Sequence, residues 1–225
     1  MRAVQQFLYH HKYEVLLVAL LQHLFIGMFF FHLPTYSNAL MTFNMSVVGV
    51  ASLGVFAGRS RYTKGLRNLL FVLILLITIS DGIWRSHPPF MIAFSGVYGL
   101  FFALIFREVM RFLFRPGYIN QDVLLASLCG YFLLIEVSAF VLMMLYLHNP
   151  TSFKGVDNGS PGSVFFDLVY FACITLATIG YGDITPNLHY TKLLAAFLGI
   201  VGQFYIVVLM GIMISKFSSG NRKDL

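Results

Sequence analysis

The sequence predicts an all-α integral membrane protein with six transmembrane helices. Of its 225 residues, 58% are hydrophobic and only 11% are charged, and the mean hydropathy is +0.79. Soluble domains are about half apolar and about a quarter charged. Six apolar segments are each about 20 residues long, which is enough to cross a bilayer as a helix. They lie near residues 14–33, 38–57, 66–84, 90–110, 123–147 and 190–216.

Lys and Arg are unevenly distributed between the two sides of these segments. Three of the 15 lie on one side, namely Arg85, Lys154 and Lys192. The other twelve lie on the opposite side, where both termini also lie. Cytoplasmic loops of membrane proteins are enriched in basic residues, so both termini are predicted to be cytoplasmic. We therefore expect a multi-pass protein of the plasma membrane, embedded in the lipid bilayer.

The composition also excludes several classes of function. The net charge is +6, but no basic run alternates with exposed aromatic residues, so no nucleic-acid partner is expected. Cys129 and Cys173 lie in apolar stretches and are interpreted as small buried hydrophobic residues. The spacing of Cys and His suggests no metal site, and we expect no catalysis and no cofactor.

The fourth segment has basic residues only at its end. None occurs from Met91 to Phe106, and then Arg107, Arg111 and Arg115 follow at a spacing of four. This spacing is typical of an amphipathic helix. Residues 107–122 are therefore predicted to form a linker that lies along the inner membrane surface towards the fifth segment.

Glu136 falls near the middle of the fifth segment, where an ionised carboxylate is costly. We predict that it is neutral and hydrogen-bonded to a group of the short apolar segment 163–177 or of the sixth segment; a pH-sensing role is the alternative. Between these segments, the loop 148–162 is rich in Asn, Pro, Gly and Ser and is predicted to be extracellular. It contains a glycosylation sequon at Asn158, a pattern that is also common by chance.

The segment 163–177 is too short to cross the membrane, and it ends at the polar run Thr178-Ile179-Gly180-Tyr181-Gly182-Asp183. Its two glycines alternate with larger residues, so every second residue can adopt a φ that L-residues avoid, and successive carbonyls can point the same way. Such oxygens can replace the water shell of a monovalent cation, and the Thr178 hydroxyl can add one more ring. A glycine-rich turn without function is the alternative.

The run from Ile174 to Asp183 resembles the pore signature of potassium channels, and the resemblance extends without gaps from about Phe165 to Phe217. It implies a six-helix channel of the voltage-gated type, in which residues 163–177 form a re-entrant pore helix. It also implies two domains, a four-helix voltage-sensor-like domain (1–115) and a pore domain (116–225) of outer helix, pore helix, filter loop and inner helix. The selectivity filter would comprise Thr178, Ile179, Gly180, Tyr181 and Gly182, with K⁺ bound at the first four.

The resemblance also implies how the filter is supported. Paired tryptophans of the family pattern are replaced here by Tyr170 and Phe171. The Tyr170 hydroxyl can reach the Asp183 carboxylate at the outer mouth, whereas Phe171 offers no donor. Tyr181, which should point away from the ions, would therefore depend on Thr175 for a hydrogen bond.

In the sixth segment, Gly202 falls at the family's hinge position, and Leu209-Met210-Gly211 replaces the family's Pro-x-Pro. Any bend is therefore expected at Gly202 or Gly211. Close helix packing is the alternative role for these glycines. Met210 and Ile214 are candidates for the narrow inner mouth, and Gln203 and Ile206 are expected to face the cavity.

These features predict a tetrameric, potassium-selective channel that conducts passively, because a ring of oxygens needs four equivalent loops and the chain has one signature. The fourth segment lacks the regular arginines of voltage sensors, so gating by voltage should be weak or absent. Two alternatives remain, a subunit of a potassium transporter and an electrically silent partner subunit of another channel. A transporter would be expected to have repeated broken helices, and no second copy of the signature occurs.

Overall fold

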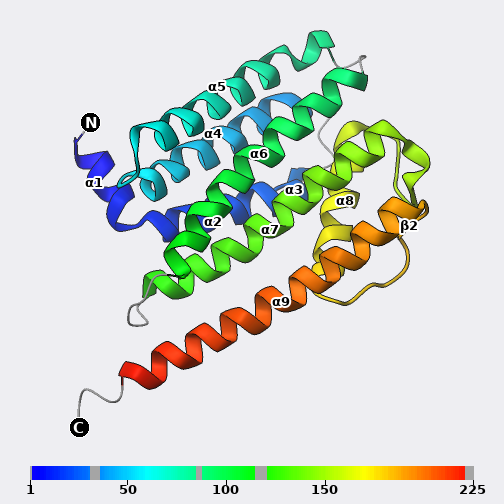
Figure 1. The fold of residues 1–225 in the computed structure, drawn as a ribbon. Coiled ribbons are helices and arrows are strands. Elements are labelled where there is room, and N and C mark those ends of the chain that lie inside the picture. Colours follow the sequence, from blue (N-terminus) through cyan, green and yellow to red (C-terminus); the bar gives the residue numbers. More distant parts are fainter. Residues whose placement is uncertain (1, 31–35, 85–87, 115–120, 221–225) are drawn as a thin grey trace.

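The computed structural model of the chain is almost entirely helical and describes residues 2–30, 36–84, 88–114 and 121–220 (Figure 1). Its helices are α1 (Arg2–His10), α2 (Lys12–Phe25), α3 (Gly27–Phe30), α4 (Tyr36–Phe56), α5 (Arg61–Trp84), α6 (Pro88–Leu113), α7 (Gln121–His148), α8 (Pro161–Leu176) and α9 (His189–Gly220). A short 3₁₀ helix (Pro150–Ser152) precedes strand β1 (Phe153–Lys154), which pairs antiparallel with strand β2 (Thr185–Pro186).

Three helices of the described residues are long and apolar enough to cross a membrane. They are Pro89–Leu113, Gln121–His148 and His189–Leu209, and they coincide with the predicted fourth, fifth and sixth segments. Shorter apolar stretches occur at Phe43–Phe56 in α4 and Gly162–Leu176 in α8. The helical class and three candidate spans are thus confirmed, and the other three spans stay predictions.

The first predicted segment is not one helix. Instead of continuing over residues 14–33, α2 ends at Phe25, and α3 begins after a turn at Ile26. The 14 residues of α2 extend about 21 Å at 1.5 Å per residue, less than the roughly 30 Å hydrocarbon core of a bilayer. Residues 31–33 lie outside the described part.

The predicted surface linker over residues 107–122 is also wrong in its first half. Helix α6 continues to Leu113, and Arg107 and Arg111 lie on it. Both contact Glu108, a residue of α6 whose side chain is fully buried and also contacts Arg59 in the α4–α5 turn. The apolar run and these two arginines thus belong to one helix, and Glu108 offsets part of their charge. Arg115 and the rest of 115–120 lie outside the described residues.

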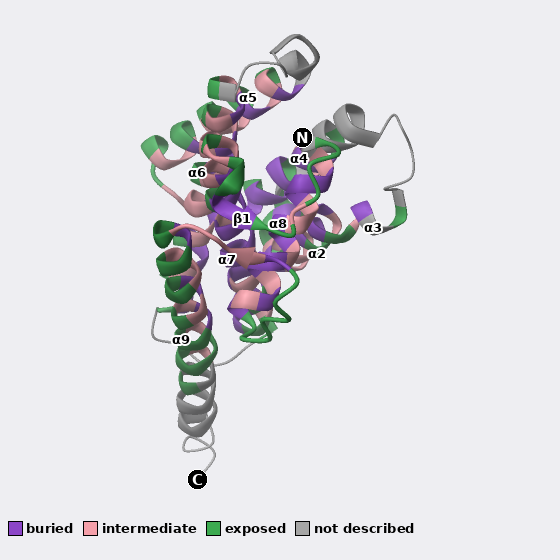
Figure 2. Cartoon of the chain, turned by 90° about the vertical axis from the view of Figure 1, so that its right-hand side faces the viewer, coloured by how far each residue is buried: buried purple, intermediate pink, exposed green. Residues whose placement is uncertain are grey.

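The helices lie roughly lengthwise beside one another (Figure 1). Helix α2 contacts α4 and α7, α5 packs between α4 and α6, and α6 packs along α7. Helix α8 contacts both α7 and α9. Most of α7 is buried, whereas exposed residues follow much of the described length of α9 (Figure 2).

An aromatic stack joins α6, α7 and α8. The ring centroid of Phe140 lies 5.0 Å from that of Tyr98, 5.7 Å from that of Phe102 and 5.2 Å from that of Phe165. These separations lie in the favourable range for aromatic pairs. One buried hydrophobic cluster therefore extends from the amino-terminal helices to α8. The predicted domain boundary at 115/116 falls within residues 115–120, outside the described part.

Candidate functional site

The glycine-rich run begins where α8 ends. Ser160 caps the start of α8 by accepting a hydrogen bond from the Ser163 amide, and Pro161 occupies the first turn. These residues are typical of a helix start. At its other end, the Ile174 carbonyl accepts hydrogen bonds from the amides of Ile179 (2.8 Å) and Gly180 (3.2 Å). A helix is present where one was predicted over 163–177, with bounds Pro161–Leu176, and its role as a re-entrant pore helix stays a prediction. Its last carbonyls fix the start of the loop.

The backbone of the run alternates as its sequence predicts. Gly180 and Gly182 have φ values of +56° and +85°, and Thr178 has +58°. Glycine adopts such angles without steric cost. Thr178 was not expected there, because a β-branched residue with positive φ is an outlier that costs on the order of 1–3 kcal/mol. Every second residue from 178 to 182 thus has the conformation that a ladder of carbonyls requires.

The glycine-rich run is exposed on the surface of the single chain. The side chains of Ile179 and Tyr181 are 54% and 72% exposed, although neither is a typical surface residue. Phe171 packs against Phe153 at 5.6 Å between ring centroids. Among the described residues no hydrogen bond joins Tyr181 to Thr175, and the supporting roles of Phe171 and Thr175 stay predictions.

The predicted contact between Tyr170 and Asp183 is confirmed. The Tyr170 hydroxyl donates a 2.7 Å hydrogen bond to a carboxylate oxygen of Asp183. This bond stabilises the charged form and holds the pKa of Asp183 below its usual range. Tyr170 thereby ties α8 to the far end of the run that α8 itself begins.

A second contact at that end was not predicted from the sequence. Gly155, with φ of +85°, lies so close to the Asp183 carbonyl that a Cβ would approach its oxygen to 2.1 Å. The pairing of β1 with β2 and the 2.8 Å hydrogen bond from the Asn187 amide to the Ser152 carbonyl hold this segment in place. The signal in the sequence was Gly155 itself, within a loop assigned only as extracellular.

The glycine at the predicted hinge makes a close contact. Helix α9 is continuous through Gly202, and a Cβ there would lie 2.3 Å from the Leu176 carbonyl oxygen. This supports the close-packing alternative, and a hinge stays a prediction. Gly211 has open space around it. Gln203 and Ile206 are exposed on the single chain, whereas the side chains of Met210 and Ile214 lie outside the described part.

The predicted partner of Glu136 is wrong. One of its carboxylate oxygens lies 2.5 Å from Nδ1 of His23, on α2, rather than near a group of α8 or α9. Both side chains are buried, and the second carboxylate oxygen has no hydrogen-bond partner among the described residues. The His23 ring also contacts Phe165 of α8, at 6.1 Å between centroids. The pair therefore joins α2 to α7 directly behind α8.

A comparison with known protein families matches part of the second half of the chain. Residues 130–219 match a family described as "Ion channel", a segment that begins in α7 and contains α8, the run and nearly all of α9. Two-pore potassium channel 4 of Arabidopsis thaliana is 32% identical over 85 residues, covering 36% of this chain and 30% of that protein. Two pore potassium channel c of Oryza sativa subsp. japonica is 32% identical over 87 residues, 36% of this chain and 19% of that protein.

A third relative has a higher sequence identity over a shorter alignment. Two-pore potassium channel 3 of Arabidopsis thaliana is 47% identical over 49 residues, which are 22% of this chain and 11% of that protein. The alignments thus span less than a third of these relatives. No solved structure matches the chain. The region matched by the ion-channel family contains the alternating backbone of residues 178–182.

The contact between Tyr170 and Asp183 leads to a pH-dependent prediction. Because it lowers the pKa of Asp183, its contribution to stability is present above the ordinary pKa of an Asp and is lost as the pH falls through the lowered value. Tyr170→Phe should therefore lower the melting temperature at neutral pH, and the difference from wild type should shrink in acid. Thermal unfolding of purified protein between neutral and acidic pH measures this.

The control is Tyr190→Phe. The Tyr190 hydroxyl is hydrogen-bonded to Ser152 rather than to a carboxylate, so any cost of its removal should not follow the titration of Asp183. An effect of Tyr170→Phe that is the same at every pH would contradict the role of the Asp183 charge.

The buried pair of His23 and Glu136 leads to another prediction. Glu136→Leu should destabilise the protein by about 1–3 kcal/mol, because it leaves the His23 ring buried without its partner. Glu136→Gln, which keeps a hydrogen-bonding oxygen, should be close to wild type. In the double variant Glu136→Leu/His23→Leu the losses should be less than additive. Thermal unfolding in detergent measures all of these, and strictly additive losses would show that the pair is not coupled.

Proposed function

We propose that the chain is one subunit of a tetrameric potassium-selective channel, which conducts K⁺ passively through the backbone carbonyls of residues 178–182. The observation that carries this proposal is the alternating backbone of Thr178, Gly180 and Gly182 at the end of α8. Rings of backbone carbonyls form the selectivity filters of potassium channels. The match of residues 130–219 to an ion-channel family and the names of the relatives support the proposal.

The ion sites in this proposal are the Thr178 hydroxyl and the carbonyls of Thr178, Ile179, Gly180 and Tyr181, with Gly182 completing the filter. Neutral oxygens replace the hydration shell of K⁺, so no cofactor and no catalytic step is needed. Helix α8 ends at the start of this run. Its carbonyl end, which has a partial negative charge, would favour a cation below the filter.

Four chains are needed to complete such a filter. One chain provides one run, and its side chains of Ile179 and Tyr181 are exposed on the single chain. Helix α9 likewise exposes large apolar side chains on the subunit surface, namely Leu193, Phe197, Ile200, Phe204 and Val207. A fourfold assembly around the run would cover the filter side chains and part of α9, as expected for a closed symmetric oligomer.

The membrane arrangement is also part of the proposal. Six spans with both termini cytoplasmic, in the plasma membrane, are proposed from the apolar segments and from the distribution of Lys and Arg. The first of these spans would consist of α2 and α3 together, because α2 alone is too short. In this orientation the α4–α5 turn and the end of α6 face the cytoplasm. The loop that contains Gly155 and Asp183 faces outward.

The same recording experiment tests conduction and selectivity. The purified chain alone, in planar bilayers, should give single-channel current steps with a reversal potential near that of K⁺ under opposed K⁺ and Na⁺ gradients. Steps exclude a carrier, and conduction by the chain alone excludes an electrically silent subunit. A reversal potential that does not change when K⁺ and Na⁺ are exchanged would contradict the proposal.

Gly180→Ala provides the sharpest variant for that experiment. It should abolish conduction or selectivity, because a Cβ at a φ of +56° costs roughly 1–2 kcal/mol in each of four subunits and shifts the carbonyls. The control is Gly65→Ala in α5, since Gly65 has open space around it and no positive φ. The control should conduct like wild type.

Voltage dependence should be weak. A voltage sensor moves charges across the field, each worth about 2.3 kcal/mol per 100 mV. Here Arg107 and Arg111 lie at one end of α6, in contact with the buried Glu108. Open probability measured over a wide voltage range should therefore change little. Steep activation whose slope decreases in Arg107→Gln or Arg111→Gln would contradict this expectation.

A further inference from the structure

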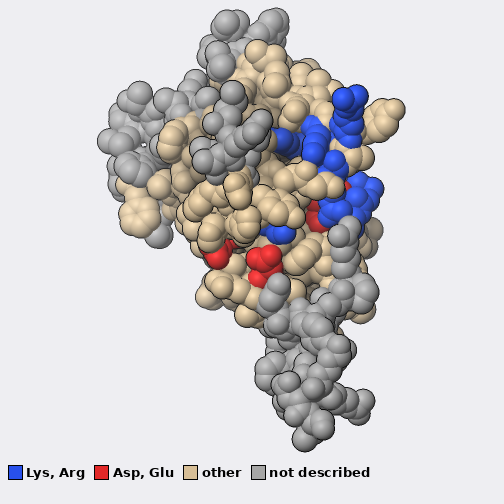
Figure 3. Space-filling view, turned by 90° about the vertical axis from the view of Figure 1, so that its left-hand side faces the viewer, with Lys and Arg blue, Asp and Glu red and all other residues tan. Residues whose placement is uncertain are grey.

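Basic side chains gather at the end of the bundle formed by the α4–α5 turn, the first turns of α5 and the last turns of α6. Figure 3 shows Lys and Arg concentrated on one part of this face. We define the basic cluster as Arg59, Arg61, Lys64, Arg67, Arg107 and Arg111. The channel function proposed above does not use it.

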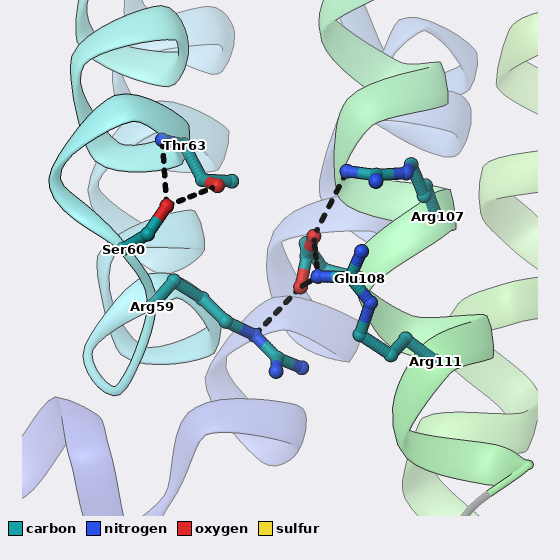
Figure 4. A network of polar contacts seen from close by, with 6 residues as sticks. All are labelled: Arg59, Ser60, Thr63, Arg107, Glu108 and Arg111. Carbon is teal, nitrogen blue, oxygen red and sulfur yellow. Dashed lines mark hydrogen bonds and ion pairs between the residues drawn. The ribbon is translucent and has the colours of Figure 1, made fainter.

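One buried carboxylate organises half of this cluster. The Glu108 side chain is fully buried and lies 2.6 Å from Arg59, 3.0 Å from Arg111 and 3.4 Å from Arg107 (Figure 4). Three guanidinium groups thus share one negative charge. The cluster as a whole has six basic groups and one carboxylate, so most of its positive charge is not offset within the chain.

The remaining three basic residues have no acidic partner among the described residues. Arg61 and Lys64 lie in the first turns of α5, which contain no acidic residue although a helix start favours negative charge. The carboxylates of Glu14 and Asp122 at this end of the bundle already contact His11 and Lys12. No carboxylate among the described residues therefore offsets the charge of Arg61 and Lys64.

Arg67 is a buried basic residue that also lacks an anionic partner among the described residues. It is only 5% exposed, its guanidinium lies 5.9 Å from the centre of the Phe56 ring beside the α4–α5 turn, and its Nε has no hydrogen-bond partner among the described residues. A buried polar group without a partner is costly. An anion bound at the turn would be held by the exposed Arg and Lys groups around it. Its negative charge would also attract the buried positive charge of Arg67 and so reduce this cost.

The surroundings of the cluster are apolar. Tyr62, Leu66 and Leu69 of α5 are exposed, as is Phe114 directly after α6. Tyr is enriched at the membrane–water interface. Exposed Leu side chains of a membrane protein commonly contact the acyl chains of lipids. An anion with an attached hydrocarbon chain matches this combination better than a free phosphate does.

We propose that the basic cluster binds the phosphate-bearing headgroup of an anionic phospholipid, with Arg61 and Lys64 contacting the phosphates and the exposed apolar residues of α5 contacting the acyl chains. Clusters of four to eight Lys and Arg at the membrane surface recognise such lipids, at about 1 kcal/mol per basic residue. A headgroup with more than one phosphate fits the excess of charge best.

The test uses the purified full chain in neutral detergent, titrated with a fluorescent phosphatidylinositol bisphosphate and followed by anisotropy. Arg61→Gln/Lys64→Gln should weaken binding about 25-fold, or about fivefold for each charge removed. The control Lys154→Gln/Lys192→Gln removes the same charge from exposed residues elsewhere in the chain and should bind like wild type. Neither pair is part of the proposed filter, and conduction tests that proposal separately.

The remaining outcomes are decisive as well. Equal losses in the two double variants would overturn the proposal in favour of unspecific attraction. Soluble inositol trisphosphate that binds as tightly as the lipid would overturn the assignment to a lipid and indicate a free phosphate ligand. If the double variant at the cluster does not fold, Lys64→Gln alone should still weaken binding about fivefold, and unchanged binding would refute the role of the cluster.

Discussion

The close approach of α9 to the end of α8 determines the geometry of the whole second half of the chain. Gly202 lies against the Leu176 carbonyl, and a side chain at this position would collide with the backbone of α8. The contact fixes where α8 ends relative to α9. Because the glycine-rich run starts one residue beyond Ala177, which caps α8, its starting point is fixed as well.

The run itself is held at both ends by groups of the same chain. At its start, the Ile174 carbonyl accepts the amides of Ile179 and Gly180. At its end, Asp183 is held by the Tyr170 hydroxyl and by close contact with Gly155. The two backbone hydrogen bonds at its start each contribute on the order of 1 kcal/mol, which together is comparable with the roughly 1–3 kcal/mol cost of the positive φ at Thr178. A polar, glycine-rich segment can thereby keep one conformation.

Local pattern predicted three of the candidate membrane helices and the positive φ of Gly180 and Gly182, because these depend on residues close together in the chain. The contact between Tyr170 and Asp183 was predicted from the resemblance to potassium channels. The partners of buried charges were not predictable in this way. His23 and Glu136 are separated by 113 residues, and Arg59 lies in the α4–α5 turn whereas Glu108 lies in α6. The burial of Glu108 could not be read from its position at the end of an apolar segment, where an exposed carboxylate would give the same pattern. The positive φ of Thr178 was missed because a β-branched residue disfavours it locally, and only the surrounding contacts impose it.

The aromatic stack from Tyr98 and Phe102 through Phe140 to Phe165 has a mechanical consequence. Rings packed at these distances have little room to slide, since protein interiors are as dense as organic crystals. Helices α6, α7 and α8 therefore behave as one stiff block, to which α2 is clamped by His23 and Glu136. Helix α9 is held to the same block by two contacts, Gly202 against the Leu176 carbonyl and the Tyr205 hydroxyl on the Ser127 carbonyl. These contacts lie within one helical turn of each other, so a force on α9 at this level is transmitted to α7 and α8 together.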